Sequence, residues 1–161
     1  METATRNIAP SRVARTMAAA QWPDVQDQRK CTRGVFGFTC SGHGGLIAVI
    51  GEADLPDAAI TAARETGRTG LVVFSPGRTF RTEKWTPDSL TAWAESRGYP
   101  IFEVWIGEED CDFATLCYAN DEIRTGGIRS GYFSESCTAE YCRENIDRWN
   151  EEWLAIFERE S

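Results

Sequence analysis

The sequence lacks any long apolar run, and none approaches the roughly 20 residues that a membrane-spanning helix requires. Its N-terminus carries Arg6, Arg12 and Arg15 but no apolar core of the length found in signal peptides. We therefore expect a cytoplasmic protein that neither spans a membrane nor is secreted.

An excess of basic residues is also absent, because 17 Lys and Arg stand against 25 Asp and Glu, a net charge of −8. Proteins that bind nucleic-acid phosphates or anionic membranes need a basic face, so we expect neither kind of partner. An acidic surface instead suits a basic protein, including one that itself binds nucleic acid. Much of the charge lies near the C-terminus, where residues 135–161 contain eight acids and three arginines, a net charge of −5.

Closely spaced cysteine pairs are missing as well, since none of the six cysteines belongs to a C-x-x-C motif. Cys137 and Cys142, with four residues between them, come nearest to a metal-binding spacing, which is weak support for zinc. In a reducing compartment we expect all the cysteines to be free thiols, and the sequence indicates no resident metal or cofactor.

What the chain does contain is the pattern of a single α+β domain. Its 161 residues, with six Trp and eight Phe, are enough to bury a core. We expect residues 22–161 to form this domain and residues 1–21 to be a flexible arm. The predicted sheet is mixed or antiparallel with about four strands. These are residues 35–39, 46–50, 71–75 and 101–106, with 79–82 as a candidate short strand.

Three to four helices should cover this sheet. Capping residues predict helices after Asp54 and Thr86. The acidic start of residues 108–119 favours a further helix there, with an alternating strand as the rival interpretation. Residues 24–33 and 120–135 have the composition of loops, the second with one short strand at most.

The last helix is predicted as one long element from Ser136 to Phe157. Apolar residues recur there at spacings of four and three, which is typical of a helix with one buried face. This seam could bury against the sheet or against a second copy of the chain, so a homodimer through residues 136–157 is one prediction. The seam consists of Cys142, Ile146, Trp149, Trp153 and Ile156.

The only histidine, His43, lies in a glycine-rich stretch between two predicted strands. Gly42, Gly44 and Gly45 would let backbone approach a ligand and expose the imidazole, which suits a general base near neutral pH. The alternative is an ordinary turn whose histidine ring bonds a backbone carbonyl.

A second stretch, Glu108-Glu109-Asp110-Cys111-Asp112, concentrates acids around a thiol. One interpretation is a solvated helix start. A second is a nucleophilic Cys111 with His43 as base and Asp110 orienting it, and a third is a divalent cation held by carboxylates and His43. The neighbouring acids work against the nucleophile, since they raise a thiol pKa. Glu108, Glu109 and Asp112 are candidate binding residues together with the glycines.

The order of these motifs resembles an uncharacterised domain found in proteins that phages and plasmids encode. The matching residues are Trp22, Ser41-Gly42-His43-Gly44-Gly45 and Glu108 to Phe113, so the resemblance covers about residues 22–120. It implies an origin in a mobile element, hence a host-cell cytoplasm, and it implies that the two motifs pair in space. It implies no activity.

Two functions of different classes follow. The first is a small acidic accessory protein that binds and modulates a host or competitor protein, for example as an inhibitor of a host defence system. The second is a hydrolase or transferase that uses His43 with Cys111 or Asp110. The acidic composition favours the non-enzymatic function.

Overall fold

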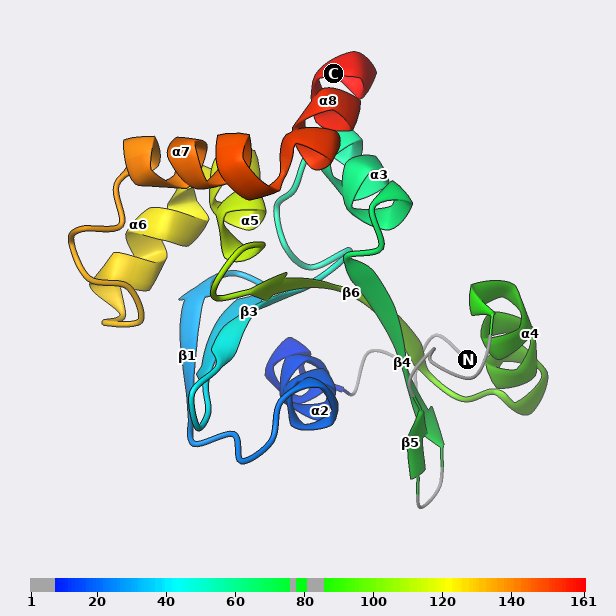
Figure 1. The fold of residues 1–161 in the computed structure, drawn as a ribbon. Helices are drawn as coiled ribbons and strands as arrows, with labels where there is room; N and C mark the ends of the chain where they lie inside the picture. The colour runs from blue at the N-terminus through cyan, green and yellow to red at the C-terminus, as the bar shows by residue number, and fades with distance from the viewer. Residues whose placement is uncertain (1–7, 76–77, 81–85) are drawn as a thin grey trace.

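A computed structural model describes residues 8–75, 78–80 and 86–161. Within these residues one antiparallel sheet of six strands has the order β1-β2-β3-β6-β4-β5 (Figure 1). Central strand β3 is buried on both faces, as the unbroken apolar run in its sequence predicts. The strands are β1 (Asp27–Thr32), β2 (Val35–Thr39), β3 (Gly44–Val49), β4 (Thr69–Ser75), β5 (Arg78–Phe80) and β6 (Ile101–Glu108).

Helices cover both faces of the sheet in Figure 1. Among the described helices, α2 packs on one face, and α3 with α5 to α8 forms a layer on the other. Helix α4 lies apart, near the far ends of β4 and β6. The described helices are α2 (Pro10–Gln21), α3 (Asp57–Glu65), α4 (Pro87–Arg97), α5 (Phe113–Ala119), α6 (Asp121–Arg129), α7 (Ala139–Trp149) and α8 (Glu151–Glu160).

The predicted α+β class and the four predicted strands are confirmed. The prediction of a loop at residues 24–33 is wrong, because residues 27–32 form edge strand β1. Its sequence is polar, and an exposed edge strand does not need apolar alternation. The candidate strand at 79–82 overlaps β5, although residues 81–82 lie outside the described part of the chain. No helix in the described ranges is long and apolar enough to cross a membrane.

The flexible arm predicted at residues 1–21 is contradicted where the chain is described. Residues 10–21 form helix α2, whose Val13, Ala14, Met17 and Ala18 are buried against the sheet. Small side chains hid this apolar stripe in the sequence. Pro10 at the first helical position and the Trp22-Pro23 stop mark the ends of the helix.

The loop predicted at residues 120–135 is also wrong, since residues 121–129 form helix α6. The Asn120 side chain caps it by accepting the Glu122 N–H at 3.0 Å. Gly126 suggested a loop but serves close packing instead. A Cβ at this position would collide with the carbonyl oxygen of Cys31 in β1, so only glycine lets the helix approach the strand.

The single C-terminal helix predicted over residues 136–157 is two helices, α7 and α8, separated at Asn150. This residue is 1% exposed, and its side chain bonds groups from other elements. The apolar seam is covered within the chain, because Cys142, Ile146 and Trp153 belong to the main core. Trp149 is the exception and is 61% exposed.

Candidate functional site

The His43 turn and the acidic stretch meet at one end of the sheet. Strands β3 and β6 pair with Gly45 opposite Glu108, and the Glu109 N–H donates to the Gly44 carbonyl at 2.9 Å. The prediction that the two stretches are neighbours is therefore confirmed.

Trp22, which together with the two motifs carries the family resemblance, lies at the same end of the sheet. Its Nε1 donates to Oε2 of Glu108 at 3.0 Å, and Nε2 of Gln21 donates to Oε1 at 2.9 Å. Both carboxylate oxygens of Glu108 thus receive a hydrogen bond from the end of α2. Glu108 fastens α2 to the sheet, which is a structural role.

His43 itself is exposed, and its ring forms no hydrogen bond or ion pair with another described residue. Its backbone closes the turn, where the Cys40 N–H donates to the His43 carbonyl at 2.9 Å. A general base needs a hydrogen bond, direct or through water, to its nucleophile. No direct bond of this kind joins His43 to Cys111 or Asp110 among the described residues, so the enzymatic hypothesis gains no support here.

The glycines beside His43 serve the fold. Gly44 and Gly45 are buried in β3, and their carbonyls accept from Glu109 and Tyr132 respectively. A Cβ at Gly45 would clash with the Gly107 carbonyl of the next strand. The close approach predicted for a ligand is thus made by the protein's own backbone. Gly42 is exposed, with φ of 82°.

The Cys111 thiol is poorly suited to act as a nucleophile. Burial raises its pKa, and the negative charges of Asp112 and Glu108 raise it further against a smaller opposing effect of Arg68. The reactive form of a thiol is the thiolate, which a raised pKa disfavours. All six cysteines are free thiols, as predicted.

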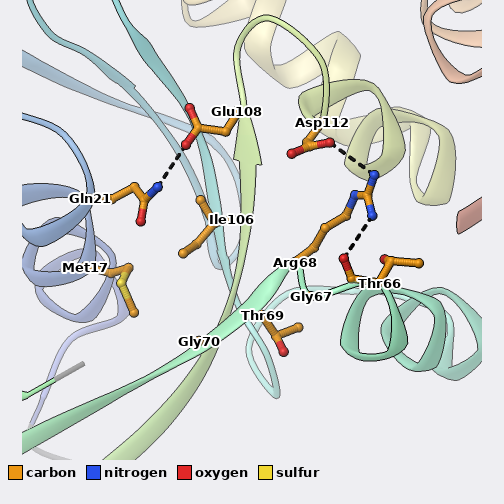
Figure 2. Close-up of a pocket in the computed structure, with 10 residues that line it drawn as sticks. All are labelled: Met17, Gln21, Thr66, Gly67, Arg68, Thr69, Gly70, Ile106, Glu108 and Asp112. Carbon is orange, nitrogen blue, oxygen red and sulfur yellow. Dashed lines mark hydrogen bonds and ion pairs between the residues drawn. The ribbon is translucent and has the colours of Figure 1, made fainter. Parts of the chain in front are cut away.

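Two hollows flank the acidic stretch. The first, which we call the paired cleft, has a cavity volume of about 360 Å³ and lies between α2 and the start of β4 (Figure 2). Its lining is Met17, Gln21, Thr66, Gly67, Arg68, Thr69, Gly70, Ile106, Glu108 and Asp112.

The charged groups of the paired cleft bond within the protein, except that Nε of Arg68 is buried without a hydrogen-bond partner. Arg68 forms an ion pair with Asp112 at 3.2 Å, and its guanidinium also donates to the Thr66 carbonyl and to Oδ1 of Asn150. The Asn150 amide donates onward to the Cys111 carbonyl at 2.5 Å. This network holds together the β4 start, the acidic stretch and the break between α7 and α8.

The second hollow, which we call the acidic groove, has a cavity volume of about 490 Å³. Its buried and half-buried lining is aromatic and thiol, namely Phe113, Tyr132, Phe133 and Cys137. Its exposed rim consists of Thr39, Glu109, Asp110, Ser134, Ser136 and Tyr141. Thr39 is the residue just before the turn that carries His43, so that turn flanks one end of the groove.

The carboxylates of the acidic groove are not neutralised. Neither Glu109 nor Asp110 forms an ion pair with a described residue, and none of the groove's lining residues is Lys or Arg. Tyr132 lies beside them, with its hydroxyl donating to the carbonyls of Phe38 at 2.9 Å and Gly45 at 3.1 Å. Burial first, and the charge of Glu109 second, raise the pKa of this tyrosine.

A smaller cavity of about 160 Å³ adjoins the groove beside the end of α7. Asp110 and Tyr141 line both hollows, and Glu144, Asn145, Arg148 and Trp149 complete the smaller one. Tyr141 is 50% exposed and stacks on Phe113 with ring centroids 6.3 Å apart. Two exposed aromatic side chains therefore stand in an acidic surface.

The candidate metal ligands do not come together. Among the described residues, no group of three or more His, Cys, Asp or Glu side chains is placed to hold a metal ion. Cys137 and Cys142 lie with Sγ atoms 3.9 Å apart, and both thiol pKa values are raised, that of Cys142 to about 12.

Several residues of the site have no clear signal in the sequence. Arg68 and Asn150 are single polar residues far apart in the chain, and only the fold joins them. Tyr141 and Tyr132 carry a weak signal, since an aromatic residue next to polar neighbours at a helix start or in a glycine-rich stretch is a candidate surface contact.

Together these features define an α+β protein with a helix-covered antiparallel sheet and an acidic, aromatic groove at one sheet end. A scan against protein-family models and searches of curated proteins and solved structures found no match.

Proposed function

We propose that this chain is a small non-enzymatic accessory protein that binds and modulates another protein through the acidic surface around α7. In this proposal the partner is a host or competitor protein, and the origin in a phage or plasmid rests on the motif resemblance. Inhibition of a host defence system is one form that such modulation takes.

The observation that carries the proposal is the exposure of Tyr141 and Trp149 within an acidic surface. Tryptophan and tyrosine are enriched among residues that dominate binding energy at protein interfaces. A 61% exposed Trp149 loses apolar burial that the adjacent seam residues of α7 and α8 obtain. A bound partner supplies that burial.

The charge of the same surface narrows the class of partner. Exposed Glu140, Glu144, Glu151 and Glu152 lie on α7 and the start of α8, in the segment whose net charge is −5. Complementary charge speeds association and excludes wrong partners. A second acidic copy of this chain would bring like charges together, so a basic heterologous partner is favoured over a homodimer.

Capture from host lysate tests the proposal when it is paired with a surface variant. The wild-type protein is immobilised and the retained proteins are identified, purified and measured for direct binding. The same measurement is made on Trp149→Ala, which removes an exposed side chain and should leave the fold intact. We expect about tenfold or greater loss of affinity in the variant, the scale of a central interface tryptophan.

A second tryptophan variant serves as control: Trp93→Ala removes a half-buried tryptophan from α4, which lies away from α7 in Figure 1, and it should not alter binding of the folded protein. Equal affinity of wild type and Trp149→Ala for every directly binding partner would contradict the proposed surface.

A further inference from the structure

We propose that the acidic groove binds an extended segment of the partner that carries Lys or Arg side chains. This inference rests on the proposed function and assigns the chemistry of the partner at one place on the surface.

The first argument is charge. Glu109 and Asp110 are exposed at the rim without an ion pair to any described residue, while nearby Glu108 and Asp112 are both bonded. The lining of the groove contains no cation, and that of the adjoining cavity contains one, Arg148. The groove therefore has two negative charges that no described cation compensates, and an incoming cation is attracted to them.

The second argument is the aromatic lining. Phe113 packs against both Phe133 and Tyr141, with ring centroids 5.6 Å and 6.3 Å away. Half-exposed Tyr141 lines both hollows, as Asp110 does. An aromatic face next to a carboxylate is a favourable environment for guanidinium or ammonium, through the cation–π attraction added to the charge.

The third argument is shape. Thr39 at the end of β2 and Tyr141 on α7 both line the groove, and the cavity next to Trp149 shares Asp110 and Tyr141 with it. Two adjoining hollows with common lining residues offer room for an extended chain, in which alternate side chains point the same way. Basic side chains would face the rim carboxylates, and apolar ones between them would face Phe113 and Phe133.

The test uses the full chain and a synthetic probe, an acetylated and amidated peptide of roughly nine residues, ~30 Å when extended, in which arginine alternates with leucine. Its affinity is measured by isothermal titration calorimetry at about 50 mM salt, where surface charges are weakly screened. We expect binding to wild type, and about tenfold or greater weakening in the double variant Glu109→Gln/Asp110→Asn, equivalent to two charge contacts.

The charge-matched control is Glu95→Gln/Glu158→Gln, which removes two exposed acids from α4 and α8 and leaves the groove intact. Its affinity for the peptide should stay within about twofold of wild type. Equal weakening in both double variants would show attraction to net charge alone and would overturn the inference. Absence of peptide binding to wild type would overturn it as well.

Sedimentation at several protein concentrations tests whether a second copy of the chain occupies the groove. A concentration-dependent dimer that Glu109→Gln/Asp110→Asn alters would overturn the inference. The proposed function fails separately, because it depends on loss of partner binding in Trp149→Ala and not on the peptide. If the peptide fails to bind while Trp149→Ala still loses the partner, the groove assignment alone is wrong.

Discussion

The paired cleft and the acidic groove each take two of the four carboxylates in the acidic stretch, yet these carboxylates have opposite surroundings. Glu108 and Asp112 line the cleft and are bonded by Trp22, Gln21 and Arg68. Glu109 and Asp110 line the groove and lack an ion pair with any described residue. One short stretch thus divides into acids that are bonded within the protein and acids that form no ion pair with a described residue.

The division follows from the geometry of β6. Alternate side chains of a strand point to the same face, so Ile106 and Glu108 both line the cleft. The strand ends at Glu108, and Glu109 and Asp110 in the following turn line the groove. The chain then enters α5, and Asp112 just before this helix pairs with Arg68. The end of the strand therefore separates the acids of the cleft from those of the groove.

Among the variants that test this contrast, the largest loss of unfolding free energy is expected for a residue of the cleft. Arg68→Ala leaves Asp112 and Asn150 without their shared donor in a site where the Arg68 and Asp112 side chains are 14% and 22% exposed. We expect the free energy of unfolding in urea to fall by about 2–4 kcal/mol, as for loss of one partner of a mostly buried pair.

The control for this variant is Arg64→Ala. Arg64 pairs with Glu103 on a more open surface, where the arginine side chain is 53% exposed. Exposed pairs contribute about 0–1 kcal/mol, so this variant should lose much less stability. Comparable losses of unfolding free energy in both variants would show that the Arg68 network stabilises the fold no more than an exposed ion pair does.

A smaller effect is expected from a groove residue whose side chain hydrogen-bonds two strands. Tyr132→Phe removes the hydroxyl that donates to Phe38 and Gly45, at a cost of about 1 kcal/mol in unfolding free energy. Substitutions of the exposed rim acids Glu109 and Asp110 should show no comparable loss.

The same variant has a defined pH dependence. Because the pKa of Tyr132 is raised in the folded protein, its contribution is present below the ordinary tyrosine pKa of about 10 and declines as the pH rises above it. Unfolding measured from pH 8 to 11 should show a steeper alkaline loss for wild type than for Tyr132→Phe, by up to about 1.4 kcal/mol per pH unit. Parallel curves would mean that Tyr132 titrates alike in both states.

The smallest effect is expected for His43→Ala. The ring is exposed and has no bond to another described residue, so the unfolding free energy should change by less than about 0.5 kcal/mol. A thermal or urea measurement that shows a loss above about 1 kcal/mol would indicate a structural contact of the imidazole.

The sequence was sufficient for the parts of the fold that follow from local patterns. Apolar runs identified β2, β3, β4 and β6, and Thr86 caps α4 as predicted. Asp54 does not cap α3, which begins at Asp57 directly after Pro56. Sequence-based prediction was wrong where tertiary packing overrides local preference. Gly126 lies in helix α6, because only a residue without a Cβ lets this helix approach β1. Asn150 interrupts the apolar seam, because its buried side chain hydrogen-bonds the Cys111 carbonyl.

For the site, the sequence correctly predicted that the His43 turn and the acidic stretch are neighbours, but it did not reveal the role of each residue. It treated Glu108 to Asp112 as one cluster, since composition does not reveal which carboxylate meets Arg68 and which meets solvent. The aromatic lining of the acidic groove was not predicted, because Phe113, Tyr132 and Tyr141 come from separate parts of the chain.

The division of the acidic stretch is tested most directly by urea unfolding of Asp112→Asn beside Asp110→Asn. Both variants replace one carboxylate by an amide of the same shape, two residues apart. We predict that Asp112→Asn lowers the unfolding free energy by about 1–3 kcal/mol, while Asp110→Asn changes it by less than about 0.5 kcal/mol. Equal losses in the two variants, or a larger loss for Asp110→Asn, would contradict the assignment of structural acids to the cleft and free acids to the groove.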